Sequence, residues 1–441
     1  MRESKRAFSV VRRLLITVFA VAAIPAAYAQ LHIEITNGVS NAVPIAVVPF
    51  ARAVPADGGL DVAGVVDHDL GGSGRFRTLS GPRLPTSTPT RADDVVAADW
   101  KSAGADYVVV GRLSSIEGGQ VAVDFDLVNA QTGQRVVSQR FVGTTSALRN
   151  AAHRVSDVVY EKILGIRGAF ATRIAYVAVD GEAPSQTYQL VVADADGENQ
   201  RLVLQSRFPL MSPAWSPDGQ WLAYVSFENK RSAVYVQLVR TGERRQVSAR
   251  VGINGAPAWS PDGKKLALTL GGSTGNPDIY VLDLGTQNLA QLTNDPAIDT
   301  EPTFSPDGRF IYFTSDRAGG PQIYRIGVNP GDKPKRITFT GNYNARPRVS
   351  ADGTQLALVT LDNGNYRIAV QDLASGTLRV LSHGHLDESP SFAPNGATLM
   401  YSERDANRGS LATVSVDGLT GLRLKAEQGE VREPAWGPFI Q

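Results

Sequence analysis

A seven-residue motif recurs along the chain and constrains its fold more than any other feature. Five complete copies begin at Pro213, Pro257, Pro302, Pro347 and Pro390, and a shortened copy begins at Pro434. The first two copies read Pro-Ala-Trp-Ser-Pro-Asp-Gly, and successive copies start 43 to 45 residues apart. A period of this length is typical of the four-stranded blade of a β-propeller.

Each position of the motif has a structural reason. Ser-Pro-Asp-Gly suits a tight turn, because proline presets φ, aspartate bonds to the local backbone and glycine accepts a positive φ. The leading proline lacks an N–H donor and therefore belongs at the start of a strand. The large apolar third residue is expected to fill the contact between neighbouring blades.

Strand-like segments between the motifs complete four strands per repeat. An apolar segment follows each turn, as at 222–225, and a second ends at a glycine-bearing turn, as at 279–282. The third is short and polar, as expected of an outer edge strand. Residues 173–177 have no motif before them and the last motif has no strand after it, so we expect these ends to pair in one shared blade. The sequence therefore predicts a six-bladed β-propeller over residues 170–441, closed by this pairing.

Residues 30–165 follow a different pattern, which predicts a small α/β domain. Apolar or alternating strand segments lie at 44–50, 106–110, 121–128 and 136–142, and helical spacing at 61–70, 92–103 and 146–164. Residues 31–36 alternate apolar and polar side chains, which is compatible with an edge strand or with a free arm. The fold class predicted for the chain is thus a multidomain one, α/β followed by all-β.

The first 29 residues predict an export signal. Five basic residues and one acidic residue accompany a short apolar stretch, and Ala27-Tyr28-Ala29 forms a small-x-small cleavage site. The stretch is shorter than the roughly 20 residues that span a bilayer, so we expect no direct membrane span, with an uncleaved anchor as the alternative. Cleavage changes the net charge from +1 to −3, which gives no basis for nucleic-acid binding. Because the chain has no cysteine, it carries neither a lipid anchor on cysteine nor a disulfide.

Catalytic motifs are weak. Gly271-Gly-Ser273-Thr-Gly275 matches the nucleophile elbow of a propeller-capped serine peptidase. However, a proline and a further strand follow it, where the elbow requires a helix. A sugar-binding propeller is a third class, but it needs aromatic platforms on its rim, and most aromatic residues here fall inside strand segments. We therefore predict that the chain is not an enzyme.

Metal-binding motifs are equally weak. His383 and His385 have no third ligand at a suitable spacing, which favours a surface turn. Asp194-Ala-Asp196-Gly197 begins like a calcium loop but lacks the later ligands, which favours a hairpin turn. We predict no cofactor. The sequence leaves open whether a cation binds loosely in the propeller channel.

Several segments resemble the TolB family of the Tol–Pal system of Gram-negative bacteria. They are residues 44–50 (PIAVVPF), 165–176 (GIRGAFATRIAY), 210–219 (LMSPAWSPDG) and the repeats downstream. The resemblance covers essentially the whole mature chain. It implies a periplasmic interaction protein, monomeric within its complex, which supports outer-membrane integrity and constriction during cell division and which colicins exploit.

The resemblance also implies two binding sites. In the family, the propeller binds the lipoprotein Pal, the N-terminal arm binds the inner-membrane protein TolA, and Pal binding orders and hides the arm. The Pal site maps to the loops that enter the motif strands, at Asn254, Ala256, Thr300, Glu301, Arg346 and Glu388. The TolA site maps to the arm, residues 30–37, at Gln30, Leu31, His32, Ile33, Glu34 and Ile35. Ile253 departs from the family pattern, in which a polar residue can occupy this place.

Overall fold

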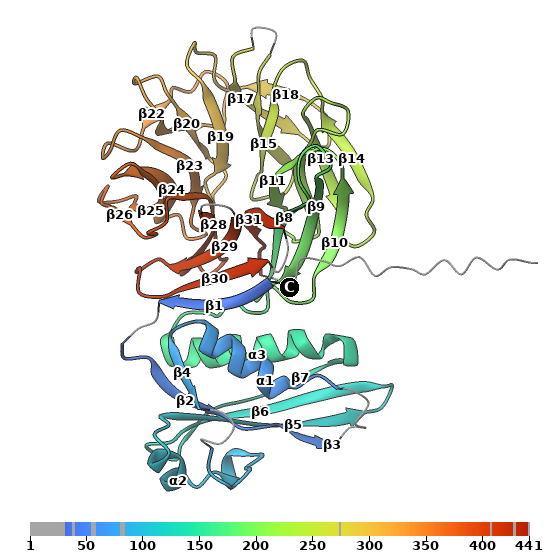
Figure 1. Cartoon of the computed structure of the whole chain (residues 1–441), viewed down its shortest axis with the longest axis vertical. Coiled ribbons are helices and arrows are strands. Elements are labelled where there is room, and N and C mark those ends of the chain that lie inside the picture. The colour runs from blue at the N-terminus through green and yellow to red at the C-terminus, as the bar shows by residue number, and fades with distance from the viewer. Residues whose placement is uncertain are drawn as a thin grey trace, which may run out of the picture.

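A computed structural model describes residues 31–37, 40–53, 59–79, 84–272, 275–405, 408–426 and 429–439. The chain forms a small α/β region and a larger all-β region of propeller-like sheets (Figure 1). Within the described ranges, no helix has both the length and the apolar character needed to cross a membrane. The predicted signal peptide and Gln30 lie outside the described residues.

The N-terminal region is one mixed sheet with two helices on one face (Figure 1). The sheet order is β4-β2-β5-β6-β7, and β3 pairs with β5. The strands are β2 Val43–Val47, β3 Ala51–Ala53, β4 Phe76–Leu79, β5 Tyr107–Ile116, β6 Gln120–Asn129 and β7 Arg135–Thr144. Helices α1 (Val62–Gly72) and α3 (Leu148–Leu164) bury Val66, Val155 and Val159 against this sheet.

One helix predicted in this region is divided in two. Helical spacing predicts a single helix over 92–103, whereas the structure has a 3₁₀ turn, η2 (Ala92–Asp94), and a short helix, α2 (Ala97–Ser102). Val95 and Val96, which lie between them, have extended backbones. The Ala92 N–H donates to the buried Asp126 carboxylate at 2.9 Å, which fixes the start of the 3₁₀ turn.

The all-β region consists of four-stranded groups. Three of them, β11–β14, β15–β18 and β19–β22, are separate sheets, and β23–β26 and β27–β30 join in a nine-stranded sheet with β1. The first strand of each group carries a motif: β11 Leu210–Trp215, β15 Asn254–Trp259, β19 Asp299–Phe304, β23 Asn344–Val349 and β27 Leu386–Phe392. The second strands are β12 Trp221–Ser226, β16 Lys265–Leu270, β20 Phe310–Ser315, β24 Gln355–Asp362 and β28 Thr398–Asp405.

The fourth strands are more exposed than the largely buried third strands, in line with the polar last strand that the sequence predicts. The third strands are β13 Ala233–Leu238, β17 Asp278–Asp283, β21 Gln322–Gly327, β25 Asn365–Asp372 and β29 Arg408–Ser415. The fourth strands are β14 Arg244–Ser248, β18 Leu289–Gln291, β22 Lys335–Arg336, β26 Leu378–Val380 and β30 Gly421–Ala426.

The two ends of the propeller region meet in a further sheet. Its order is β10-β9-β8-β31, with β8 Arg173–Asp180, β9 Thr187–Asp194, β10 Arg201–Ser206 and the C-terminal strand β31 Glu430–Trp436. β31 pairs antiparallel with β8, from Glu430 opposite Val179 to Trp436 opposite Ile174. This is the pairing that the shortened last motif predicts.

The motif residues join neighbouring groups as well as forming turns. Ser216 Oγ donates to Asp218 Oδ1 at 2.5 Å, and Gly219 adopts a φ of 66°. A Cβ added at Gly219 would lie 3.3 Å from Pro438 of the last motif. The Trp215 indole N–H donates to the Ala435 carbonyl at 3.1 Å, so the third motif residue forms the contact between units that the sequence predicts.

The N-terminal segment belongs to a propeller sheet. β1 (Leu31–Asn37) pairs antiparallel with β30, from Leu31 opposite Ala426 to Asn37 opposite Gly421. Of the two forms that the alternating sequence allows, the structure has the edge strand. This strand lies beneath the last propeller strands and beside the N-terminal region (Figure 1).

Candidate functional site

The two ends of the motif strands face different surroundings. The turns on one side contact the N-terminal region: Asn395 Nδ2 donates to the Arg167 carbonyl at 2.9 Å, and Asp417 pairs with Arg75 at 2.5 Å. The loops that enter the motif strands lie at the opposite ends of these strands. We call these loops the entry rim, and define it as residues 207–212, 250–256, 295–301, 338–346, 383–389 and 429–433.

A ring of left-handed residues marks the entry rim. Each residue directly before a motif proline has a φ between 45° and 56°, at Ser212, Ala256, Glu301, Arg346, Ser389 and Glu433. Every one of these strands also shifts register beside this residue, as at a β-bulge. Because this backbone costs a non-glycine residue roughly 1–2 kcal/mol, its recurrence points to a functional constraint.

These residues, together with Arg348, line a small cavity of about 40 Å³. Arg346 lies at its centre: its Nε pairs with Glu301 Oε1 at 2.9 Å, and its Nη1 donates to Ser389 Oγ. Glu433 accepts the Ser212 N–H. Burial lowers the pKa of Arg346, but the charges of Glu301, Glu388 and Glu433 raise it further, so the guanidinium keeps its charge. The arrangement can bind polar groups but contains no nucleophile paired with a base among the described residues.

The structure separates the predicted Pal residues into two kinds. Ala256, Glu301 and Arg346 belong to the left-handed ring, and Thr300 and Glu388 are half-buried beside it. Asn254 is only 1 % exposed, and its amide bonds Ser248, Arg250 and Gly252. In this conformation Asn254 therefore holds the loop and is not presented to a partner.

Asn254 is one of four equivalent loop clamps that the sequence reasoning missed. Asn254, Asp299, Asn344 and Asp387 are all at most 1 % exposed, and each stands three residues before a motif proline. Asp299 binds Arg317 through both oxygens, at 2.7 and 2.9 Å. The recurrence of Asn or Asp at this spacing is a signal that could have identified them.

The entry rim also exposes large apolar side chains. They are Phe208 (37 % exposed), Val251 (73 %), Ile253 (47 %), Ile298 (48 %) and Phe339 (74 %). Exposed apolar groups around a polar centre are typical of a protein-binding surface.

The predicted TolA residues lie along β1. Leu31 is 2 % exposed and packs with Tyr176, Leu411 and Leu424, whereas Glu34 is exposed and pairs with Lys425 at 2.5 Å. Among the described strands, β1 is the last of its sheet. Its outer backbone edge can therefore accept a further strand.

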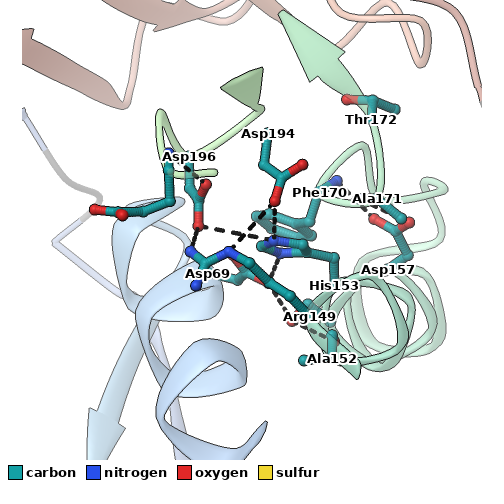
Figure 2. A network of polar contacts seen from close by, with 12 residues as sticks. Asp69, Arg149, Ala152, His153, Asp157, Phe170, Ala171, Thr172, Asp194 and Asp196 are labelled. Carbon is teal, nitrogen blue, oxygen red and sulfur yellow. Dashed lines mark hydrogen bonds and ion pairs between the residues drawn. The ribbon is translucent and has the colours of Figure 1, made fainter. Parts of the chain in front are cut away.

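A second polar cluster joins the N-terminal region to the propeller (Figure 2). His153 Nδ1 lies 2.8 Å from Asp69 Oδ2, and His153 Nε2 lies 3.8 Å from carboxylate oxygens of both Asp194 and Asp196. Arg149 pairs with the same two propeller carboxylates. Burial lowers the pKa of His153, but the negative charges of Asp194, Asp69 and Asp196 and the hydrogen bond with Asp69 raise it to about 10.

Among the described residues, the remaining motifs form no catalytic cluster. Ser273 lies outside the described residues. His383 and His385 are exposed, and His385 Nδ1 lies 3.0 Å from Asn365 Oδ1. Among the described residues, Asp69, His153 and Asp196 lie close enough to hold a metal ion, but a protonated His153 has no free nitrogen lone pair to offer. Asp194–Gly197 forms the hairpin turn that the sequence favours.

Comparisons with known proteins agree with this architecture. Residues 160–440 match the TolB beta propeller domain, and residues 31–136 match the TolB amino-terminal domain. The Tol-Pal system protein TolB of Xanthomonas oryzae pv. oryzae is 45 % identical over 416 residues, covering 93 % of each chain. That of Bordetella pertussis is 43 % identical over 430 residues, covering 97 % of this chain and 95 % of the relative. A crystal structure of TolB from Acinetobacter baumannii superimposes with a TM-score of 0.85 at 43 % identity, covering 93 % of this chain and all of the other. The chain belongs to the TolB family.

Proposed function

We propose that this chain is a non-enzymatic, periplasmic component of the Tol–Pal system, which binds Pal through the entry rim and TolA through the arm. In this proposal residues 1–29 are removed, residues 30–165 form the N-terminal domain, and residues 170–441 close into a six-bladed ring. The protein acts as a monomer within its complex, without a cofactor, in outer-membrane integrity and in constriction during division.

The observation that carries the proposal is the composition of the entry rim. Apolar side chains such as Phe339 and Val251 stand exposed around a cavity whose polar groups are already paired, as Glu301 is with Arg346. A partner that covers this rim removes apolar surface from water without stripping an isolated charge of its hydration. The N-terminal region lies at the other ends of the strands and leaves the rim accessible.

Calorimetry with purified Pal tests the rim. Phe339→Ala is expected to weaken Pal binding by about 1 kcal/mol or more, the scale of an interface hot spot. Glu301→Ala is expected to do the same, because it removes a carboxylate and leaves Arg346 without its ion-pair partner. Val142→Ala is the matched control, since Val142 is 50 % exposed on β7 of the N-terminal region. Unchanged Pal affinity in both rim variants would contradict the rim assignment.

The arm is tested separately. Deleting residues 30–37 is expected to abolish TolA capture in a pull-down while Pal binding survives, because the deletion removes an edge strand and leaves the rim intact. TolA capture by the shortened protein would remove the arm from the mechanism. For the competing peptidase hypothesis, Ser273→Ala must eliminate a measurable hydrolytic activity.

A further inference from the structure

The turn between β9 and β10 contacts both the N-terminal region and the arm. Its carboxylates, Asp194 and Asp196, face His153 and Arg149 of α3 (Figure 2). Its glycine, Gly197, lies against the arm: a Cβ built there would lie 3.1 Å from both Cβ and Cδ1 of Leu31. We call residues 194–197 the relay turn.

We propose that the relay turn couples the N-terminal region to the docking of the arm. His153 and Arg149 hold the turn where Gly197 accepts Leu31, and loss of their contacts releases β1 from β30. This inference goes beyond the proposed function, because docking is an event within one chain, whichever partner later binds the arm.

Hydrogen bonds hold the relay turn in one conformation, so a displacement of its carboxylates also displaces Gly197. The Gly197 N–H donates to the Asp194 carbonyl at 2.9 Å, and the Glu198 N–H donates to Asp196 Oδ1 at 3.1 Å. The Gly197 carbonyl in turn accepts Gln200 Nε2 at 3.0 Å. Gly197 has a φ of 87°, a conformation that glycine adopts without strain.

The contact with α3 depends on charge. His153 is 1 % exposed and lies between Asp69 of its own region and two propeller carboxylates. Ser156 Oγ donates to the same Asp69 oxygen at 2.6 Å, which fixes that carboxylate. Without the imidazolium, Arg149 alone faces Asp194 and Asp196, and Asp69 keeps only the hydrogen bond from Ser156. Removing one member of a buried ion cluster leaves uncompensated charge, which favours separation of the two surfaces.

The arm is poised to respond, because few of its described side chains are buried. Leu31 is buried, whereas Glu34 and Thr36 are exposed. The Glu34–Lys425 pair is more than half exposed on both sides, and such surface pairs contribute little. Among the described side chains of β1, Leu31 is therefore the one through which Gly197 can act on the docking of the arm.

Hydrogen exchange of the mature chain, read by mass spectrometry at residues 31–37, tests the coupling. Gly197→Ala is expected to speed exchange of the arm about tenfold, because the new methyl group displaces Leu31. Asp196→Asn and His153→Gln are expected to act in the same direction without touching the arm. Gly376→Ala is the control for Gly197, since Gly376 has a φ of 76° in the equivalent turn before β26 and no atom within 4 Å of an added Cβ. Asp124→Asn is the control for the charge changes, because Asp124 pairs with Arg140 within the N-terminal region.

The outcomes separate the two halves of the inference. Faster exchange of the arm in Gly197→Ala and in Asp196→Asn, with both controls unchanged, supports the relay. Faster exchange in Gly197→Ala alone would show that Gly197 supports the docked arm without coupling it to α3, and would overturn the proposal. Unchanged exchange of the arm in every variant would also overturn it. If His153→Gln loosens α3 itself, faster exchange within 148–164 will reveal this. The test then depends on Asp196→Asn, which changes the same contact on the propeller and leaves α3 intact.

Discussion

The charge on His153 predicts that the contact between the two regions weakens as pH rises from about 6.5 to about 10. Burial lowers the pKa of this imidazole, but the charges of Asp194, Asp69 and Asp196 and its hydrogen bond with Asp69 raise it above the ordinary 6.5, to about 10. A group whose pKa is higher in the folded state contributes stability that is fully present below its unfolded pKa. That contribution is lost as pH rises through the folded value.

The magnitude follows from the burial of the cluster. The His153 side chain is only 2 % exposed, so water screens its charge weakly. At about 1.4 kcal/mol per pKa unit, a rise from 6.5 to about 10 has an upper limit of roughly 5 kcal/mol. Breaking a buried ion pair costs about 3–5 kcal/mol. We therefore expect His153 to contribute about 3–5 kcal/mol to the free energy of unfolding at pH 6.5, and little above pH 10.

Urea unfolding of the wild type and His153→Gln at several pH values between 6.5 and 10 measures this contribution. The difference between the two proteins isolates His153 from other groups that titrate in both, such as Asp157, whose pKa burial raises to about 6. The difference should shrink steadily as pH rises. A difference that stays constant over this range, or grows with pH, would refute the assigned charge.

Two further predictions concern single buried side chains. Asn254→Ala should lower the free energy of unfolding by about 1–3 kcal/mol in urea titrations, because it leaves the buried Ser248 hydroxyl without its acceptor and removes the amide that holds the backbone of Arg250; an unaffected stability would show that water replaces the amide. Leu31→Ala should loosen the arm, since large-to-Ala changes at buried sites cost about 2–5 kcal/mol and Leu31 is the buried one among the β1 side chains that the structure describes; limited proteolysis should then cut within 31–37, and equal resistance in both proteins would contradict this.

The propeller strands could be predicted because their determinants are local and repeated. Five complete copies place aspartate or asparagine before glycine at a fixed spacing, so each copy reports the same turn independently. The N-terminal segment carries no such signal. Its partner, β30, lies almost 400 residues away, and an alternating strand is compatible with any free edge.

The polar cluster could not be predicted, because its members come from separate elements. Asp69 lies on α1, His153 on α3 and Asp196 on a propeller turn, and no motif joins them. In the sequence, His153 is a single histidine on an amphipathic helix, and Asp196 belongs to a common hairpin turn. Only tertiary packing turns them into a charged contact. The prediction of one helix over 92–103 was wrong, because the extended backbones of Val95 and Val96 divide it.

The entry rim and the relay turn stand at opposite ends of the propeller strands, and β31 connects them. Glu433 of β31 accepts the Ser212 N–H in the rim. Three residues later, the Trp436 indole N–H donates to Thr172 Oγ1 at 2.9 Å, and the Thr172 carbonyl accepts the N–H of Ala195 in the relay turn. A route of contacts does not by itself establish coupling. β31 does supply a rigid element that both sites share. Linkage is reciprocal: if a ligand bound at the rim favours the docked arm by a given factor, the affinity of the rim for that ligand falls by the same factor when the arm is released.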